Sequence, residues 1–229
     1  MTEPIALRPS EASQAARVLT RAFADDEAWR TIFPADAVRA AVLPRLWRAV
    51  VGYSLRYGEV RTTPDVAGVA CALGPGRAFV TPWCELRTGL RFSRLIASLS
   101  FENRRSFLFA AVAIDRLHHQ AMPGPHEYLW ALGVDTARQG AGTGSALVGA
   151  FVTRADEACL PAYLETETER NGTERELLPP PRVRCLARGA RTGRPTPSVG
   201  DDSPASCPLA QRARRASPDA ERWARAARG

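Results

Sequence analysis

The stretch 128-YLWALGVDTARQGAGTGSALV-148 decides the fold of this 229-residue chain. It begins as a β-strand in which Tyr128, Trp130, Leu132 and Val134 alternate with Leu129 and Ala131. A loop of small residues follows, and Ala146, Leu147, Ala150 and Phe151 then recur at helical spacing. We therefore predict a strand over 126–134, a glycine-rich loop over 139–144 and a helix over about 143–158.

Strand and helix patterns on both sides place this unit late in a mixed α/β sheet. We expect strands over 5–8, 59–62, 66–73 and 162–166, and helices over about 12–23, 34–57 and 83–120. Pro44 predicts a kink or break in the second helix. The third divides near Ser100, and its second half carries the apolar residues Phe107, Phe109, Val112 and Ile114. This element order predicts an α/β (α+β) fold.

The glycine-rich loop has the properties of an anion site. Gly140, Gly142 and Gly144 carry no side chain to block a close approach, and the helix that follows adds positive potential at its start. A dinucleotide-binding fingerprint would need a further glycine where Ser145 stands, so that pattern fails. The alternative is a glycine-rich helix entry without a ligand. The physics therefore favours a phosphate ligand without naming it.

The run Gln139, Gly140, Ala141, Gly142, Thr143, Gly144 resembles the acyl-CoA pyrophosphate loop of the GNAT N-acetyltransferases. The start 5-IALRPS-10 is similar to the first strand and turn of that family, and 163-YLETETERN-171 to its fifth strand. The resemblance covers residues 4–171. It implies a mixed, mostly antiparallel central sheet flanked by helices, with acetyl-CoA as co-substrate.

The resemblance also implies roles for particular residues. Backbone groups of Leu132, Gly133 and Val134 would pair with the pantetheine arm, and the N–H groups of residues 139–144 would hold the pyrophosphate. Asn171 stands where the family often has an asparagine that contacts the cofactor. The strands that hold Val134 and Glu165 would splay apart, with the thioester in the gap.

The reaction implied is the attack of a substrate amine on the acetyl thioester, which a general base assists. The candidates are His126, Glu127 and Glu165, of which His126 and Glu127 point to opposite faces of their strand. Two of them also have an ordinary reading, His126 as a strand-end histidine and Glu165 as a solvated strand residue. His118 and His119 are interpreted as a surface pair, because no third metal ligand accompanies them. We expect no metal.

The basic charge is concentrated at one end of the chain. Residues 1–171 hold 19 arginines and 18 acidic residues, whereas 172–229 hold 12 arginines and 6 acidic residues. The first part therefore shows no field that would attract a nucleic acid. The chain has no lysine, since all 31 basic residues are arginine, which excludes P-loop NTPase and Schiff-base chemistry.

The five cysteines form no C-x-x-C pair, which argues against a zinc site or a disulfide framework. The start of the chain lacks the pattern of a signal peptide, and no apolar run is long enough to span a membrane. We therefore expect free thiols, no membrane partner and a cytoplasmic location.

The pattern changes at Asn171. Residues 172–229 hold 8 prolines and 12 arginines, and no strand-like alternation persists. We expect a GNAT-like domain over 1–171, incomplete at its C-terminus, and a disordered Pro/Arg-rich tail over 172–229 with a short helix near 219–226. The resemblance implies a further helix and two strands after Asn171, and their loss would leave the fifth strand as an exposed edge and remove the tyrosine that commonly serves the family as general acid. A reading-frame shift in a GC-rich gene explains the composition, and a genuine extension is the alternative.

Three functions remain open. The first is N-acetyl transfer to an unknown small-molecule or peptide amine, impaired by the missing strands. The second is acyl-CoA binding without catalysis. The third is binding of nucleic acid or an acidic partner by the arginine-rich tail, which the lack of interleaved aromatic residues disfavours. The segments 29–33 and 84–120 would line the acceptor pocket, and their apolar character slightly disfavours polyamines as acceptors.

Overall fold

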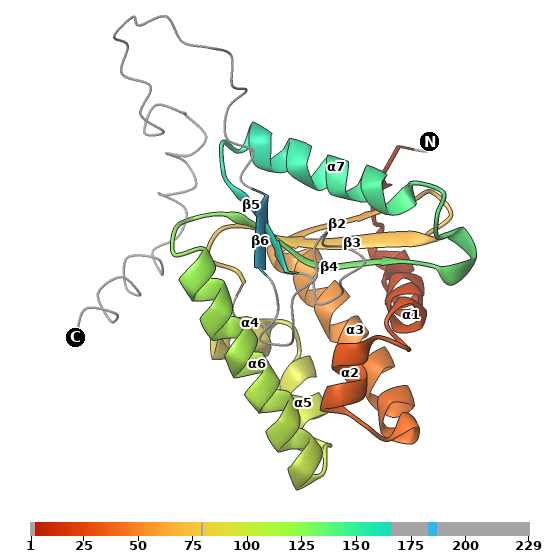
Figure 1. Ribbon diagram of the computed structural model, residues 1–229, viewed down its shortest axis with the longest axis vertical. Helices are drawn as coiled ribbons and strands as arrows, with labels where there is room; N and C mark the ends of the chain where they lie inside the picture. Colours follow the sequence, from red (N-terminus) through yellow and green to blue (C-terminus); the bar gives the residue numbers. More distant parts are fainter. Residues whose placement is uncertain (1–2, 79, 166–182, 187–229) are drawn as a thin grey trace, which may run out of the picture.

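The computed structural model describes residues 3–78, 80–165 and the backbone of 183–186 (Figure 1). Asn171 lies outside these residues, as do the expected helix near 219–226 and most of the Pro/Arg-rich segment. The predictions made for them, including the domain boundary, stay predictions.

The elements alternate largely as the sequence patterns predict. In chain order they are β1 (Ile5–Ala6), η1 (Pro9–Glu11), α1 (Ala12–Ala22), α2 (Glu27–Ile32), α3 (Asp36–Tyr57), β2 (Gly58–Thr62), β3 (Gly68–Leu73), α4 (Pro82–Arg87), α5 (Arg91–Ala97), α6 (Phe101–Ala121), β4 (Glu127–Val134), η2 (Thr136–Arg138), α7 (Thr143–Glu157), β5 (Ala162–Glu165) and β6 (Val183–Leu186).

The strands form one sheet with the order β1-β2-β3-β4-β5-β6 in the described part of the chain. Neighbouring strands run antiparallel, except that β4 and β5 are parallel. The predicted α/β (α+β) class, with a mixed, mostly antiparallel sheet flanked by helices, is confirmed. The one parallel pair needs a crossover connection, which α7 provides.

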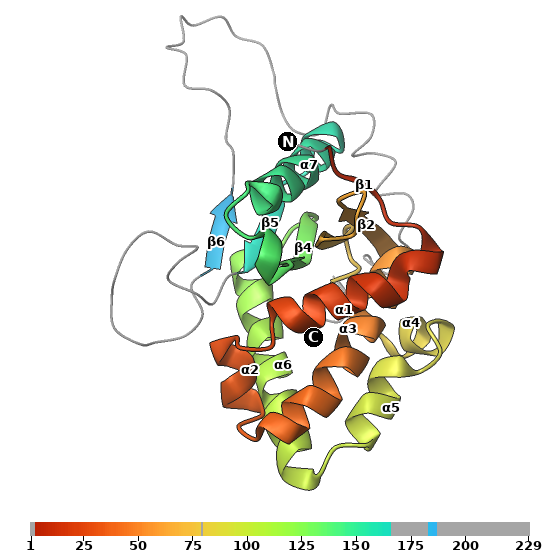
Figure 2. The same ribbon diagram turned by 90° about the vertical axis from the view of Figure 1, so that its right-hand side faces the viewer.

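Helices cover the two faces of the sheet unequally. In Figure 1 α7 lies alone above the sheet, and the other helices gather on the opposite side. Figure 2 shows α1 crossing that face with α3 beyond it. Two glycines of the sheet determine how closely α7 and α1 approach it. A Cβ on Gly68 would lie 2.7 Å from Thr143 of α7, and one on Gly133 would lie 2.9 Å from Leu19 of α1. Both helices therefore pack close to the sheet backbone.

The helical segments differ from the prediction in detail. α3 continues through Pro44, because its residues Val42, Leu43, Leu46 and Trp47 are buried and their packing holds the turn that lacks a hydrogen bond. The short helix α2 was not predicted; Asp26 caps it by accepting from the backbone N–H of Ala28 and Trp29. The division at Ser100 is confirmed, since its hydroxyl caps α6, but the part before it forms two helices.

One strand follows β5, contrary to the expectation that the family's later strands are lacking. The backbone of Val183–Leu186 pairs antiparallel with β5 from Ala162 to Glu165. The predicted exposed edge at β5 is therefore wrong. The unpaired N–H and C=O groups of a strand edge can pair with a segment that adopts an extended conformation. Val183 favours that conformation because it is β-branched.

Two further expectations concern the cysteine thiols and membrane-spanning helices. Cys71 and Cys84 are free and buried, as expected, but Cys159 is disulfide-bonded, so the expectation of free thiols is wrong at that residue. Burial raises the pKa of the Cys71 thiol to about 12, which makes it unreactive. In the described ranges, no helix combines the length and apolar character that a membrane span requires.

Candidate functional site

The parallel strands β4 and β5 separate after three residue pairs. The paired residues are Glu127 with Ala162, Tyr128 with Tyr163 and Leu129 with Leu164. From Trp130 onward, no described strand pairs with β4 on that side. On its other side β4 stays paired with β3 up to Val134. The resemblance implied a gap between these strands, and the described residues leave one.

A β-bulge lies where the gap opens. Cys71 of β3 pairs with Ala131, and Ala72 pairs with Leu129, so Trp130 is the extra residue. Trp130 and Ala131 consequently both pack into the core on the α1 and α3 face, whereas Leu129 and Leu132 pack against the α7 face. The expected alternation along 128–134 is therefore wrong beyond Trp130. A bulge increases the local twist of its strand, which helps β4 diverge from β5.

The open side of β4 presents backbone hydrogen-bonding groups to the gap. Asp135 donates its N–H to Ala67 across the β3 side, at 2.8 Å. Because the groups of successive residues alternate in direction, those of Gly133 also face β3, and those of Leu132 and Val134 face the gap. The side-chain amide of Gln139 donates to the carbonyl of Val134 at 3.3 Å. An extended ligand arm would find strand-like partners at Leu132 and Val134.

The glycine-rich loop turns the chain from this edge into α7. Gly140 and Gly142 have φ angles of +82° and +78°, a region that favours glycine, and Gly142 is the N-cap of α7. Among the described residues no side chain caps this helix start, so the N–H groups of its first turn remain available to a ligand. Residues 136–141 are exposed. The predicted anion site therefore has the required backbone geometry.

Two ion pairs fix the loop to the body of the protein. Arg21 of α1 lies 2.5 Å from Asp135, and this hydrogen bond holds the pKa of the Asp135 carboxyl below its usual value. Arg138 lies 3.1 Å from Asp65 in the turn between β2 and β3. The loop is thus held at both the α1 side and the β2–β3 turn.

A cavity of about 1380 Å³ passes through the gap. On one face it is lined by Gly144, Ser145, Val148 and Gly149 of α7, and on the other by residues of α2, α3, α5 and α6. Residues 129–132 of β4 and Leu164 and Glu165 of β5 line it between these parts. Ligand sites occupy roughly 300–1,000 Å³, so this cavity is large enough for a ligand arm and a second molecule.

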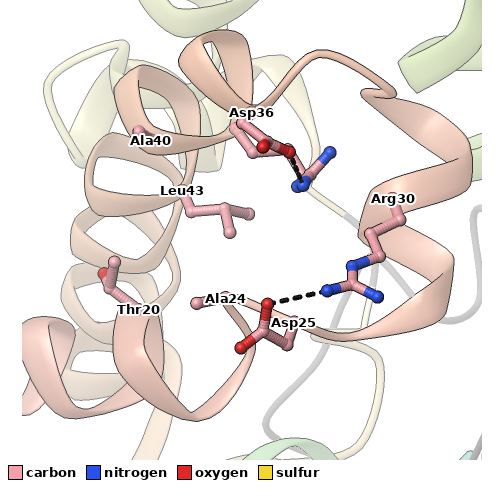
Figure 3. A pocket seen from close by; sticks show the side chains of 8 residues that line it. Thr20, Ala24, Asp25, Arg30, Asp36, Ala40 and Leu43 are labelled. Atoms are coloured by element: carbon pink, nitrogen blue, oxygen red, sulfur yellow. Dashed lines mark hydrogen bonds and ion pairs between the residues drawn. The ribbon is translucent and has the colours of Figure 1, made fainter.

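A smaller cavity of about 270 Å³ lies between α1, α2 and α3 (Figure 3). Its charged groups are already paired, Arg30 with Asp25 at 2.9 Å and Arg39 with Asp36. Arg39 also donates to the carbonyl oxygens of Phe33 and Pro34. These contacts tie α2 to the start of α3, and they leave the larger cavity as the candidate site.

A buried cluster of titratable side chains closes the gap where β4 and β5 still pair. The Glu165 carboxylate accepts from the hydroxyls of Tyr163 at 2.9 Å and Tyr128 at 3.3 Å. His118 of α6 places Nδ1 3.4 Å from the Glu165 carboxylate and Nε2 2.7 Å from Nε2 of His126. Glu165, His118 and Tyr128 line the large cavity. The cluster is therefore in contact with the space between the strands.

The carbonyl oxygen of Gly124 fixes the proton positions in this cluster. It accepts from Nδ1 of His126 at 2.7 Å, which places the proton of a neutral His126 on Nδ1. Burial, the largest cause, and the nearby His118 lower the pKa of His126, so this residue is neutral at pH 7. Its Nε2 then accepts from Nε2 of His118. The two histidines thus form a chain of hydrogen bonds that begins at the Gly124 carbonyl and ends beside the Glu165 carboxylate.

The three predicted base candidates lie in different places. Glu165 lines the cavity. His126 and Glu127 face opposite sides, as predicted, and neither is among the cavity-lining residues. Glu127 forms an ion pair with Arg154 of α7 at 2.9 Å, while burial raises the pKa of its carboxyl. These roles stay predictions, and Glu165 has the geometry closest to that of a base.

Three residues of the cluster were missed. His118 is only 3% exposed, so its interpretation as a surface residue is wrong, whereas His119 is exposed as expected. Tyr128 and Tyr163 were assigned only to strands. The sequence signal was weak: adjacent helical residues point about 100° apart, so one histidine of the pair can face inward while the other faces solvent.

Among the described residues, no group of three or more His, Cys, Asp or Glu is placed to hold a metal ion. The expectation that the site works without a metal stays a prediction.

Comparison with known proteins supports the fold. The chain is similar to a solved structure described as histone acetyltransferase HPA2 and related acetyltransferase, from Corynebacterium glutamicum ATCC 13032. The two are 20% identical with a TM-score of 0.53, over 75% of this chain and 80% of the other. No protein-family model and no curated protein matches the chain. The expected resemblance to a GNAT acetyltransferase is thus confirmed for the fold.

Proposed function

We propose that this protein binds acetyl-CoA and transfers the acetyl group to an amine acceptor. The observation that carries the proposal is the cavity through the gap between β4 and β5, with the uncapped start of α7 on one side and the free edge of β4 within it. The acetyltransferase fold supports it. The cytoplasmic location and the small-molecule or peptide acceptor expected from the sequence belong to the same proposal.

The chain has residues that fit acetyl-CoA. The N–H groups of the loop and of the first turn of α7 would hold the pyrophosphate, because they converge on an exposed point with positive potential. A Cβ on Gly140 would meet nothing within 4 Å, so the space above the loop is open. Leu132 and Val134 would pair with the pantetheine arm. Acetyl-CoA supplies an activated thioester for the amine to attack.

The buried cluster would handle the proton of the reaction. The amine must lose a proton to form the new C–N bond, and the departing sulfur gains one. Glu165 faces the cavity and receives two tyrosine hydroxyls, which hold its carboxylate in one orientation. His118 and His126 connect it to the exposed Gly124. We propose Glu165 as the proton acceptor and His118 as the residue that positions it.

Calorimetric titration with acetyl-CoA tests the cofactor half of the proposal. Ala141→Glu places a negative charge on the exposed loop without a positive φ, and we expect it to weaken binding at least about tenfold by repelling the pyrophosphate. Ala37→Glu makes the same change at an exposed position in the first turn of α3 and is the matched control.

Equal binding by the native chain and Ala141→Glu, or no binding by the native chain, would contradict the loop assignment. Binding without release of CoA thiol across a panel of amines would instead support the alternative of acyl-CoA binding without catalysis.

A further inference from the structure

The large cavity carries negative charge and no arginine. Five of its lining residues are acidic, namely Asp26, Glu85, Asp115, Asp156 and Glu165. No arginine of the described chain lines it, although arginine supplies all 31 basic residues of the sequence. The rest of the lining on the helical face is mostly apolar and aromatic. On its helical face such a lining disfavours an anionic acceptor and accommodates a cation with an apolar body.

One of these acids has a buried oxygen that the fold leaves without a partner. Glu85 of α4 is 5% exposed. Its Oε1 accepts from the N–H groups of Phe92 and Ser93, at 2.9 and 3.4 Å, and so caps the start of α5. Its Oε2 has no hydrogen-bond partner in the described part of the chain. A buried carboxylate oxygen without a donor is costly, so this atom calls for a ligand or other explanation.

Two of the aromatic residues that line the cavity with Glu85 lie close to each other. The ring of Phe92, whose backbone N–H binds Glu85, lies 5.9 Å from the ring of Trp130. The ring of Tyr53 lies 6.3 Å from that of Phe92 and 5.5 Å from that of Trp130. Trp130 is the bulged residue at the gap. A carboxylate and aromatic rings that line the same cavity are the chemistry that binds an ammonium group.

We propose that Glu85, Phe92 and Trp130 bind the ammonium group of the acceptor, and that the acceptor is a monoamine with a bulky apolar body. This inference rests on the proposed function, because the acceptor is the amine of that reaction. The ammonium group donates to Oε2 of Glu85, and the apolar body lies among the rings of Trp29, Trp47 and Phe107, which line the same cavity. Glu85 is a binding residue in this scheme and holds the amine in its charged form. To react, the amine leaves Oε2 and gives one proton to Glu165, the neutral nitrogen attacks the thioester, and its next proton goes to the departing sulfur.

The test compares a cation with its neutral counterpart of nearly equal shape. Binding of 2-phenylethylamine and 2-phenylethanol to the full chain is measured at pH 7 by calorimetry. We expect the amine to bind about tenfold more tightly than the alcohol, because a buried carboxylate forms a stronger hydrogen bond with a charged donor than with a neutral one. In Glu85→Gln the side chain can still cap α5, and we expect the preference to fall to within about twofold while the alcohol binds as before.

The matched control is Asp115→Asn, which removes a half-exposed carboxylate of the same cavity and should leave the preference intact. Equal affinity of the native chain for the two probes would overturn the inference, and so would a preference that survives Glu85→Gln. Tighter binding of spermidine than of 2-phenylethylamine would overturn the monoamine assignment.

Acetyl-CoA binding to the same variants separates the two proposals. Intact acetyl-CoA binding without an amine preference contradicts this inference and leaves the proposed function standing. An amine preference without acetyl-CoA binding contradicts the proposed function and leaves the cavity assignment standing.

Discussion

The two sides of the gap between β4 and β5 are built from different parts of the polypeptide. On the α7 side the proposed binding groups are backbone N–H and C=O groups, presented by a glycine-rich loop and by an edge of β4 that no described strand pairs with. On the α6 side they are buried and half-buried side chains that come from positions 85, 118, 128 and 165. The first side would bind through its backbone conformation and the second through its side-chain chemistry. Substitutions should therefore act differently on the two sides.

The largest expected effect is a difference in kcat between variants of Glu165, on the α6 side of the gap, and of Glu127, on the α7 side. Glu165→Gln should lower kcat for release of CoA thiol about 100-fold, since the proton acceptor is lost, and leave the affinity for acetyl-CoA within twofold. Glu127→Gln, on the α7 side, should change kcat less than about threefold. Steady-state kinetics with an accepted amine gives both numbers.

A greater loss in Glu127→Gln than in Glu165→Gln would place the proton acceptor on the α7 side. In that case the buried cluster would be a structural network, and the contrast between the two sides of the gap would fail.

Two glycines of α7 test whether the positive φ at the helix start affects the free energy of unfolding. Gly142 caps α7 at φ +78°, whereas Gly149 lies inside the same helix and a Cβ there would meet nothing within 4 Å. Gly142→Ala should lower the free energy of unfolding by about 1–2 kcal/mol, because an L-residue is strained there. Gly149→Ala should raise it by roughly 0.5–1 kcal/mol through helix propensity.

Urea unfolding of the two variants beside the native chain measures both changes. Changes of the same sign would show that the conformation of Gly142 is not the one described, and the loop assignment would lose its basis.

The smallest effect concerns pH and the buried cluster. The folded pKa of His126 lies below its unfolded value of about 6.5, mainly because of burial. The unfolded chain then binds more protons as the pH falls, so stability is full above pH 6.5 and decreases from there down to the folded pKa. The decrease should approach ~1 kcal/mol per pH unit, and His126→Gln should remove it.

The comparison uses urea midpoints at several pH values between 5 and 8. His118, His119 and Glu165 also act electrostatically on His126, so His119→Gln, an exposed neighbour, serves as the control. A native slope that persists in His126→Gln would assign the effect to another group.

The sequence predicts best where neighbouring residues set the structure. The loop, the strand before it and α7 were predicted nearly to the residue, because glycine positions and helical spacing act over a few residues. The prediction was poorer for α6, whose Phe109 and Val112 were counted as apolar markers and are 78% and 58% exposed. Spacing shows that a helix exists but does not fix which side it buries.

The sequence by itself determined the glycine-rich turn, most of the order of strands and helices, and the resemblance to an acyl-CoA loop. Each depends on local conformational preference. Only the tertiary structure decided that Trp130 is a bulge, that β6 covers β5, and that His118 meets Glu165 inside a cavity. Those facts depend on the pairing of segments far apart in the chain, and a side chain reveals its partner only after the sheet has brought the two together.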